Sequence, residues 1–245
     1  MNLLIFCIFQ LLVTLSVFGN DIAVLTLSVG VKYNEATHLG ILSKSYYCKK
    51  HGYDFIVQST SLDPKRPISW SKILQIKNVL KNYKWIFFTD ADSLIMNYSI
   101  KLESFLDDQY NMIICKDGHS LNCGQFFLKN TPWSIQLLTE TYNETEDIFN
   151  SLWEQEALRK VLKKNNSYFS KIKILPLRAF NSFRTSFFYD YPSNERGDIY
   201  FLENDFIVHF CGIRDLITLK TEMHSYALQS KSYPCNSDDD LSFVD

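Results

Sequence analysis

The chain has 245 residues, of which 46% are hydrophobic and 15% are aromatic. This composition excludes a disordered chain, and the length is sufficient for one large α/β domain with a substantial core. The formal net charge of −2 argues against a nucleic-acid-binding protein, which usually carries a basic face.

The first twenty residues are the most apolar part of the sequence. Residues 3–18 carry no charged side chain, but this stretch is short for a membrane span, which needs ~20 residues. It is typical of the core of a signal peptide, and Val17 and Gly19 are small enough for a cleavage site. An uncleaved signal anchor is the alternative. Residues 1–20 therefore predict entry into the secretory pathway, meaning the Golgi or ER lumen or secretion, with membrane attachment only if the segment stays uncleaved.

Sequons and cysteines also suit an oxidising lumen. Asn97, Asn143 and Asn165 each begin an N-glycosylation sequon. In such a compartment we expect one or two disulfides, and the sequence leaves the pairing open. The cysteines that follow the apolar segment are Cys48, Cys115, Cys123, Cys211 and Cys235.

Strands and helices are predicted to alternate along the N-terminal half. Apolar runs indicate buried strands, and Gly52 is expected to end the first helix. In chain order we expect a strand over 22–29, a helix over 34–52, a strand over 53–58, a turn over 63–67, a helix over 70–80 and a strand over 85–89. This alternation predicts a parallel sheet with crossover helices.

The C-terminal half continues the same pattern. Thr131 and Pro132 form a favourable helix start, with threonine as the cap and proline in the first turn. We expect strands over 112–115, 124–128, 171–176 and 205–210, and helices from 131, over 153–164 and over 216–227. The sequence has no repeat and no linker. It predicts one α/β domain over 21–235, with a mostly parallel central sheet and helices on both faces, followed by a polar tail over 236–245.

Two aspartates, Asp90 and Asp92, directly follow the predicted strand 85–89. Ligands of open parallel sheets bind beyond the carboxyl ends of the strands, and neighbouring carboxylates repel each other unless a cation joins them. A hard divalent cation, Mg²⁺ or Mn²⁺, suits aspartate oxygens. The pattern itself is common, and its second occurrence at 238–240 is expected to have no function.

The late apolar segment carries His209, Gly212 and Arg214. The sequence has no GxGxxG and no GxxxxGK[ST], so a bound diphosphate would need a cation instead of those glycine-rich loops. His209 taken alone is either a buried core residue or a metal ligand. Gly212 would let the backbone approach a phosphate, and Arg214 could bind one. The set therefore favours a third metal ligand beside a diphosphate.

Several stretches occur in one order along residues 22–225. They are KKHGYDF (49–55), WSK (70–72), WIFFTDADSLIMN (85–97), LNCGQFFLKNTPWSIQLL (121–138), EQEAL (154–158), NSF (181–183) and DFIVHFCG (205–212). In that order they resemble glycosyltransferase family 34, which contains fungal α-galactosyl- and α-mannosyltransferases and plant xyloglucan xylosyltransferases. The resemblance implies a single GT-A-like domain over 21–235, with Asp90 and Asp92 as its DxD motif.

The resemblance implies a donor site of defined composition. Asp90, Asp92 and His209 would bind Mn²⁺ and the donor diphosphate. The other implied donor contacts are Ser28, Gly30 and Lys72 along the nucleotide, Asn122 and Gly124 at the donor sugar, and Gly212 and Arg214 beside the diphosphate. The chain departs from the family pattern at Cys123, where threonine or alanine is usual, and at Arg214, where lysine is usual.

Glu154 and Gln155 are the catalytic residues that the resemblance implies, beneath the reacting carbon. Without it, Glu154 and Lys72 would be interpreted as solvated residues, and Gln155 as a surface glutamine whose amide has no structural partner. Because no tuned carboxylate pair offers a nucleophile, a front-face reaction is expected. In it the leaving diphosphate helps to deprotonate the acceptor, and Gln155 stabilises positive charge on the sugar.

Two functions remain open at this point. The first is a retaining, metal-dependent glycosyltransferase that moves a hexose or pentose from a UDP-sugar or GDP-mannose to an oligosaccharide or glycoprotein, forming an α-linkage. The second is a catalytically inactive lumenal relative that binds nucleotide-sugar or glycan. Cys123 beside Asn122 motivates the second function, whereas both aspartates, His209 and Arg214 argue for the first.

Overall fold

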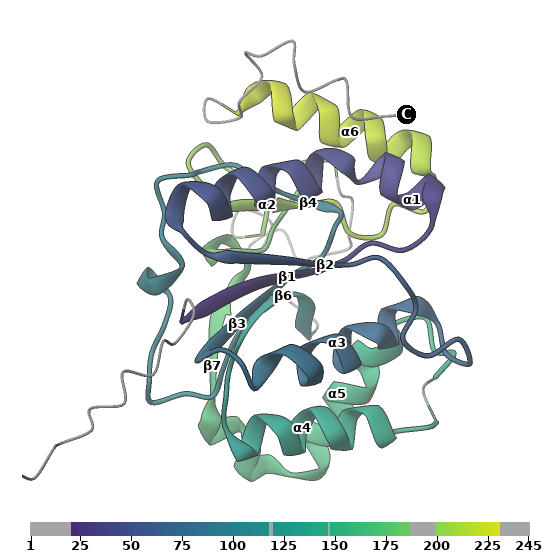
Figure 1. Ribbon diagram of the computed structural model, residues 1–245, viewed down its shortest axis with the longest axis vertical. Helices are drawn as coiled ribbons and strands as arrows, with labels where there is room; N and C mark the ends of the chain where they lie inside the picture. Colours follow the sequence, from purple (N-terminus) through teal and green to yellow (C-terminus); the bar gives the residue numbers. More distant parts are fainter. Residues whose placement is uncertain (1–20, 118–119, 147, 187–198, 231–245) are drawn as a thin grey trace, which may run out of the picture.

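A computed structural model describes residues 21–117, 120–146, 148–186 and 199–230. Within these ranges, helices pack on both faces of a six-stranded sheet (Figure 1), so the predicted α/β architecture is confirmed. The expected leader (1–20) and polar tail (236–245) lie outside the described residues. In the described part of the chain, every helix is too short or too polar to cross a membrane.

The central sheet has the strand order β2-β1-β3-β6-β5-β7. Its strands are β1 (Ile22–Leu27), β2 (Asp54–Gln58), β3 (Trp85–Thr89), β5 (Met112–Lys116), β6 (Leu121–Lys129) and β7 (Ile172–Pro176). The pairs β1–β2, β1–β3 and β5–β7 are parallel, whereas β6 is antiparallel to both of its neighbours. The sheet is therefore mostly parallel, as predicted. The strand β6 is the exception because only a short hairpin connects it to β5.

Helices lie on both sides of this sheet. In Figure 1, α1 (Val31–Ala36), α2 (His38–His51) and α6 (Leu216–Gln229) lie above it, and α3 (Ser71–Leu80), α4 (Pro132–Asn143) and α5 (Trp153–Lys164) lie below it. The strands β1 and β3 are buried along their whole length. Burial on both faces explains why they are continuous apolar runs instead of alternating patterns.

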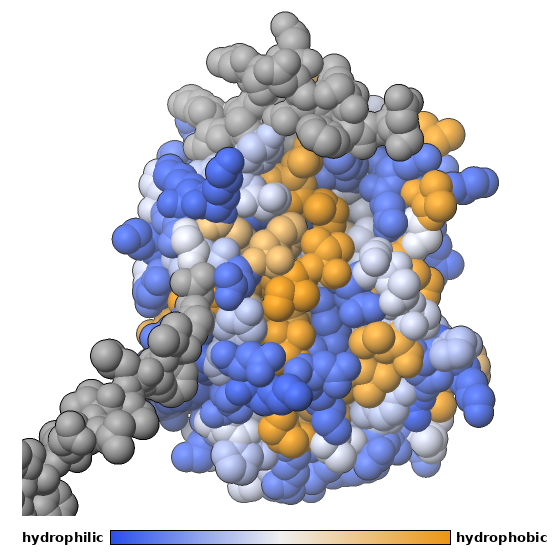
Figure 2. All heavy atoms as spheres, in the orientation of Figure 1, coloured by the Kyte–Doolittle hydropathy of each residue, from blue (hydrophilic) through white to orange (hydrophobic). Residues whose placement is uncertain are grey.

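The edge strand β2 is less covered than its neighbours, because most of its side chains are only half-buried. Figure 2 shows apolar side chains in a band across the visible face, over α2 and β2, with polar side chains around it. The strands β1 and β3 lie inside the sheet, and their carboxyl ends are the positions from which a ligand site can be built.

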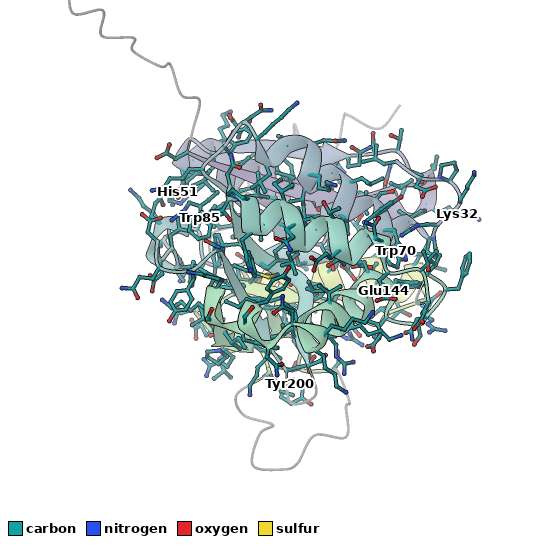
Figure 3. The ribbon with its side chains drawn as sticks, turned by 90° about the horizontal axis from the view of Figure 1, so that it is seen from below. Lys32, His51, Trp70, Trp85, Glu144 and Tyr200 are labelled. Carbon is teal, nitrogen blue, oxygen red and sulfur yellow. The ribbon has the colours of Figure 1, made fainter. Side chains whose placement is uncertain are left out.

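The ends of β1 and β3 and the start of α3 lie on one side of the molecule. Figure 3 shows Trp85, which begins β3, on the side opposite to Trp70, which directly precedes α3. Lys32, just beyond the end of β1, lies on the side of Trp70. The first turn of α3 therefore lies near the carboxyl ends of both central strands.

A second, three-stranded sheet has the order β4-β9-β8. Its strands are β4 (Ser93–Ile95), β8 (Ser182–Phe183) and β9 (Ile207–His209). Ser93 pairs with His209 across the antiparallel β4–β9 ladder, and Leu219 and Met223 of α6 pack against this sheet. This pairing joins the segment after β3 to a strand more than a hundred residues later in the chain.

Helix termini follow the sequence signals. The Thr131 side chain accepts a hydrogen bond from the Ser134 amide at 3.2 Å, and Pro132 opens α4. Gly52 ends α2 with φ of 75°, a left-handed conformation that favours glycine. Both predicted helix boundaries are confirmed.

Several boundaries differ from the prediction. The helix expected over 34–52 is two helices, because Thr37 takes non-helical angles and its hydroxyl bonds Tyr33 O at 2.8 Å. Strand β1 ends at Leu27, and β6 begins at Leu121 because it pairs with β5 from that residue. Trp70 lies in a 3₁₀ turn, Ile68–Trp70, instead of the helix.

The disulfide expectation fails for the described part of the chain. Cys48, Cys115, Cys123 and Cys211 are free thiols, and the first three are buried in the core. Burial raises the pKa of Cys48 to about 12, so its thiol stays protonated and poorly reactive. Cys235 lies outside the described residues.

Candidate functional site

Asp90, Asp92 and His209 converge at the carboxyl end of β3, and their ligand atoms all lie within 4.8 Å of one another. Nε2 of His209 lies 3.6 Å from Asp92 Oδ1 and 3.9 Å from Asp90 Oδ2. These separations are too long for hydrogen bonds. Two ligand bonds of ~2.1 Å to one small divalent cation span up to ~4.2 Å. The donor set, two carboxylates and one imidazole, therefore fits such a cation.

The fold explains why these three side chains meet. β3 ends at Thr89, and the turn that follows leads directly into β4. β4 pairs with β9, which places His209 opposite Ser93, and the Phe210 amide donates to Asp92 O at 2.9 Å. The histidine side chain is 3% exposed, whereas Asp90 and Asp92 are 28% and 18% exposed. The carboxylates are thus partly exposed, whereas the imidazole beside them is buried.

Asn122 and Gly124 lie beside this cluster on β6. The Asp90 amide donates to Gly124 O at 2.8 Å, which continues the β3–β6 ladder beyond Thr89. The Gly124 amide donates to Asn122 Oδ1 at 3.0 Å. Both residues were predicted to lie at the donor sugar, and the structure brings them next to the predicted metal ligands.

Lys72 and Glu154 form a buried ion pair under the cluster. Lys72 Nζ lies 2.9 Å from Glu154 Oε1 and 3.2 Å from Asp90 Oδ1, and it donates to Cys123 O at 3.0 Å. Both side chains are nearly fully buried, so the alternative of solvated residues is wrong for both. The three ammonium donors have three partners, and Lys72 therefore links the metal-site carboxylate to the first turn of α5.

Gln155 has a structural partner. Its Oε1 accepts a hydrogen bond from the Cys123 amide at 2.8 Å. The expectation that this amide has no structural task is therefore wrong. The reason is that α5 begins against β6, so a first-turn side chain reaches the β6 backbone. A carbonyl oxygen has two lone pairs, and one of them remains for another contact.

Electrostatics distinguish the two aspartates. Removal from water raises the pKa of Asp90 to about 6, although the Lys72 ammonium opposes the rise. Burial also acts to raise the pKa of Asp92, but attraction to His209 and Lys44 outweighs it and holds that pKa below its ordinary value. The pair thus concentrates negative charge that a bound cation would neutralise.

The remaining predicted donor contacts lie on loops around the cluster. Ser28 is buried, and its hydroxyl lies 2.8 Å from the Asn34 amide group and 3.1 Å from the Thr37 hydroxyl. Its hydroxyl therefore holds the loop after β1. Gly30 directly precedes α1 with φ of 98°, and Gly212 has φ of 79°; both angles favour glycine. Arg214 is exposed, five residues after His209.

Sequence reasoning assigned no role to Lys44, which lies fully buried in α2. Its Nζ donates to Ser93 O at 2.7 Å and to Gly40 O at 3.2 Å. A Cβ on Gly40 would lie 2.1 Å from Ala91 O, so α2 packs directly against the Asp90–Asp92 turn. The signal was available: Gly40, Ser43, Lys44, Tyr47 and Cys48 follow the spacing of a buried helical face.

Solved structures with low sequence identity share the fold. A glycosyltransferase involved in glycosylation of the major capsid of PBCV-1 superimposes with a TM-score of 0.64 at 14% identity, over 83% of this chain and 99% of that one. The galactosyltransferase LgtC, in complex with donor and acceptor sugar analogues, superimposes with a TM-score of 0.52 at 13% identity, over 86% and 97%. These similarities confirm the GT-A fold class.

Curated relatives are similar in sequence over the same region. An uncharacterised α-1,2-galactosyltransferase of Schizosaccharomyces pombe is 25% identical in an alignment of 217 residues that covers 70% of this chain and 55% of that protein. A probable α-1,6-mannosyltransferase of Saccharomyces cerevisiae is 23% identical in an alignment of 214 residues that covers 71% of this chain and 54% of that protein. The chain thus spans about half the length of these relatives. The model of the galactosyl transferase GMA12/MNN10 family matches residues 19–110 and 104–216, and the chain belongs to this family.

Proposed function

We propose that this chain is a metal-dependent, retaining glycosyltransferase. It would move a hexose or pentose from a nucleotide-sugar, a UDP-sugar or GDP-mannose, to an oligosaccharide or glycoprotein acceptor and form an α-linkage. The relatives are named as α-galactosyl-, α-mannosyl- and xylosyltransferases, which supports the donor classes and the α-linkage.

The convergence of Asp90, Asp92 and His209 at the end of β3 carries this proposal. These residues would hold Mn²⁺ or Mg²⁺, which when bound neutralises a diphosphate and stabilises its departure. Gly212 and Arg214 follow His209 on the same loop. A backbone without a Cβ and a guanidinium there can contact the same diphosphate.

Lys72 is proposed to position the site from below instead of contacting the nucleotide. Its ammonium already contacts Asp90, Glu154 and Cys123 O. Lys72 thus fixes the position of Asp90, a proposed metal ligand, relative to the start of α5. Catalytic groups that need no reorganisation during the reaction stabilise the transition state most effectively.

Gln155 is proposed to stabilise positive charge on the donor sugar in a front-face reaction. Its carbonyl oxygen is oriented by the Cys123 amide and retains a lone pair. Glu154 is buried and paired with Lys72, so it is a poor candidate for a covalent nucleophile. The departing diphosphate oxygen would then accept the acceptor proton, and the anomeric configuration would be retained.

The binding-only alternative is less well supported. It was motivated by Cys123, but the contacts at this position use the Cys123 backbone: its amide bonds Gln155 and its carbonyl bonds Lys72. The thiol itself is buried. A change of side chain here leaves both contacts in place, so Cys123 gives no reason to expect lost activity.

A lumenal location is proposed from the apolar segment over 3–18 and the sequons. The sequon at Asn143 lies on an exposed residue at the end of α4. Expression in a secretory host, followed by N-terminal sequencing and glycosidase treatment, tests this assignment. A cytosolic, unglycosylated full-length product would contradict it.

The activity is tested with purified protein, Mn²⁺ and a panel of UDP- and GDP-sugars, with nucleotide release as the signal. An acceptor glycan panel and NMR of the product then determine the linkage. We expect release from one donor, loss of release with a chelator, and an α-linked product. Absence of release from every donor would favour the binding-only function, and a β-linked product would contradict retention.

A further inference from the structure

Asn181 lies directly behind the predicted metal site and has no role in the assignments above. It is fully buried, immediately before β8. Its side chain contacts two residues of the site at once. Asn181 Oδ1 lies 2.9 Å from Nδ1 of His209, and Asn181 Nδ2 donates to Asn122 Oδ1 at 3.0 Å.

The three hydrogen bonds that link Gly124, Asn122, Asn181 and His209 can each be given a direction, starting from one backbone amide. The Gly124 N–H can only donate, and it lies 3.0 Å from the Asn122 side chain. The Asn122 atom that faces it must therefore be the carbonyl oxygen. That oxygen also faces Asn181, so the Asn181 atom in this contact must be the NH₂ nitrogen.

The assignment continues to the imidazole. With its NH₂ group toward Asn122, Asn181 presents its carbonyl oxygen to Nδ1 of His209. A carbonyl oxygen only accepts, so Nδ1 must carry a proton. In a neutral imidazole the other nitrogen then has a free lone pair, and this Nε2 is the atom that faces Asp90 and Asp92.

We infer that Asn181 is a positioning residue that holds His209 in the Nδ1–H tautomer, with the Nε2 lone pair directed at the cation site, while it also holds Asn122 on β6. Histidine ligands of metals commonly donate their second N–H to such a partner, which fixes the tautomer and the ring orientation. The inference about metal binding rests on the proposed function. The tautomer assignment does not depend on it.

This arrangement couples the two halves of the site. One amide group bridges His209 on β9 and Asn122 on β6, so a rotation of either side chain breaks a buried hydrogen bond of the other. Loss of the Asn181 carbonyl would leave a buried N–H unpaired. The imidazole could then take the opposite tautomer and direct an N–H, instead of a lone pair, at the cation.

The tautomer is tested directly in metal-free protein labelled with ¹⁵N-histidine. Long-range ¹H–¹⁵N correlation spectra, recorded on the neutral imidazole, distinguish a protonated Nδ1 from a protonated Nε2. His209→Gln identifies the resonance by its disappearance. We expect the Nδ1–H pattern for His209, and an Nε2–H pattern in the wild-type chain would overturn the assignment.

Three variants test the effect on metal binding. Asn181→Leu removes the acceptor, Asn181→Asp keeps an acceptor for Nδ1–H but removes the donor to Asn122, and Ser182→Ala is the matched control. Ser182 is the next residue, is equally buried, and donates to Asp205 Oδ2 at 2.9 Å, so its loss disturbs the same strand without touching His209. Mn²⁺ affinity is measured by calorimetry, and folding by circular dichroism.

We expect Asn181→Leu to weaken Mn²⁺ binding by about 10- to 100-fold and to lose the fixed tautomer. Asn181→Asp should retain the Nδ1–H pattern, because its carboxylate still accepts from Nδ1, and Ser182→Ala should bind as the wild type does. If Asn181→Leu folds and binds like Ser182→Ala, or if Asn181→Asp loses the Nδ1–H pattern while Ser182→Ala keeps it, the positioning role is overturned. If the wild type binds no Mn²⁺, the metal site fails, and the spectra still decide the tautomer.

Discussion

Gly124 leaves the space that the His209 imidazole occupies. A Cβ on Gly124 would lie 2.3 Å from Cε1 of His209 and 2.9 Å from its Nδ1. The imidazole is buried, and Asn181 holds its Nδ1, so it cannot move aside without losing that bond. The need for glycine here is therefore steric, and it connects β6 to the geometry of the proposed metal site.

Gly124→Ala should lower Mn²⁺ affinity at least tenfold, about 1.4 kcal/mol, because the methyl group displaces the imidazole. Calorimetry of Mn²⁺ binding to the folded variant measures this. Gly52→Ala is the control, since φ at Gly52 is 75° and no atom lies within 4 Å of the added Cβ. That variant should lose roughly 1–2 kcal/mol of stability and keep its affinity. Unchanged affinity in Gly124→Ala would contradict the steric argument.

Asp92→Asn and His209→Ala should each abolish Mn²⁺-dependent donor binding and leave the fold intact. The reason is that His209→Ala removes one ligand from a three-residue set, and Asp92→Asn removes the negative charge that attracts the cation. Donor calorimetry with and without Mn²⁺ provides the measurement. Wild-type donor affinity in both variants would remove these residues from the site.

The sequence predicted the parts of the fold that depend on local patterns. β3 and α5 have the predicted bounds, because one is a continuous apolar run and the other is amphipathic. The cluster of Asp90, Asp92 and His209 was also predicted from the strand ends and the resemblance, and the three side chains do lie together.

The features that were missed depend on distant contacts. β4 and β8 have three and two residues, too few for a periodic signal, and they exist because β9 pairs with both. The contacts of Asn181 with His209 and Asn122 span 28 and 59 residues. No local pattern encodes such a contact. The Gln155–Cys123 bond, across 32 residues, was missed for the same reason.

Lys72→Met should destabilise the protein by about 3 kcal/mol, because it leaves the buried Glu154 carboxylate without its partner. Glu154 Oε2 has no hydrogen-bond partner in the described part of the chain, so Lys72 is the residue that compensates this charge. Urea denaturation of metal-free protein measures the loss. Lys77→Met, on the same helix with a single bond to Thr139 Oγ1, should lose less than half as much. Equal losses would show that the ion pair contributes little.

Lys44 should make the stability of the folded protein vary with pH in the alkaline range. Burial lowers the pKa of Lys44 from 10.5 to about 7, so between these values the unfolded chain binds a proton that the folded chain does not. Stability must then rise with pH across this window, by up to about 1.4 kcal/mol per unit, and the gain is lost as pH falls toward 7. A neutral amine still has two N–H groups for Ser93 O and Gly40 O.

Lys44→Met isolates this effect. The stability difference between the wild type and Lys44→Met should grow in favour of the wild type from neutral pH to a pH of about 9.5, as measured by urea denaturation of metal-free protein. Lys50→Met removes an exposed lysine of the same helix and should show no such trend. A difference for Lys44→Met that stays constant with pH would place its pKa at the ordinary value.

Gln155→Ala should lower kcat at least tenfold, about 1.4 kcal/mol of barrier, with donor affinity nearly unchanged. The positive charge on the sugar develops in the transition state, so the loss of its proposed stabilisation by Gln155 appears in kcat and not in donor binding.

In the same variant the Cys123 amide loses its acceptor, so the stability of the protein should fall by about 1 kcal/mol. Gln155→Glu keeps an acceptor for that amide and should recover the stability, which separates the structural contact from the catalytic one. Glu156→Ala, the next residue, removes only an ion pair with Arg159 and should leave kcat unchanged. Full transferase activity in Gln155→Ala would exclude the catalytic role and leave Gln155 as a residue that secures α5 to β6.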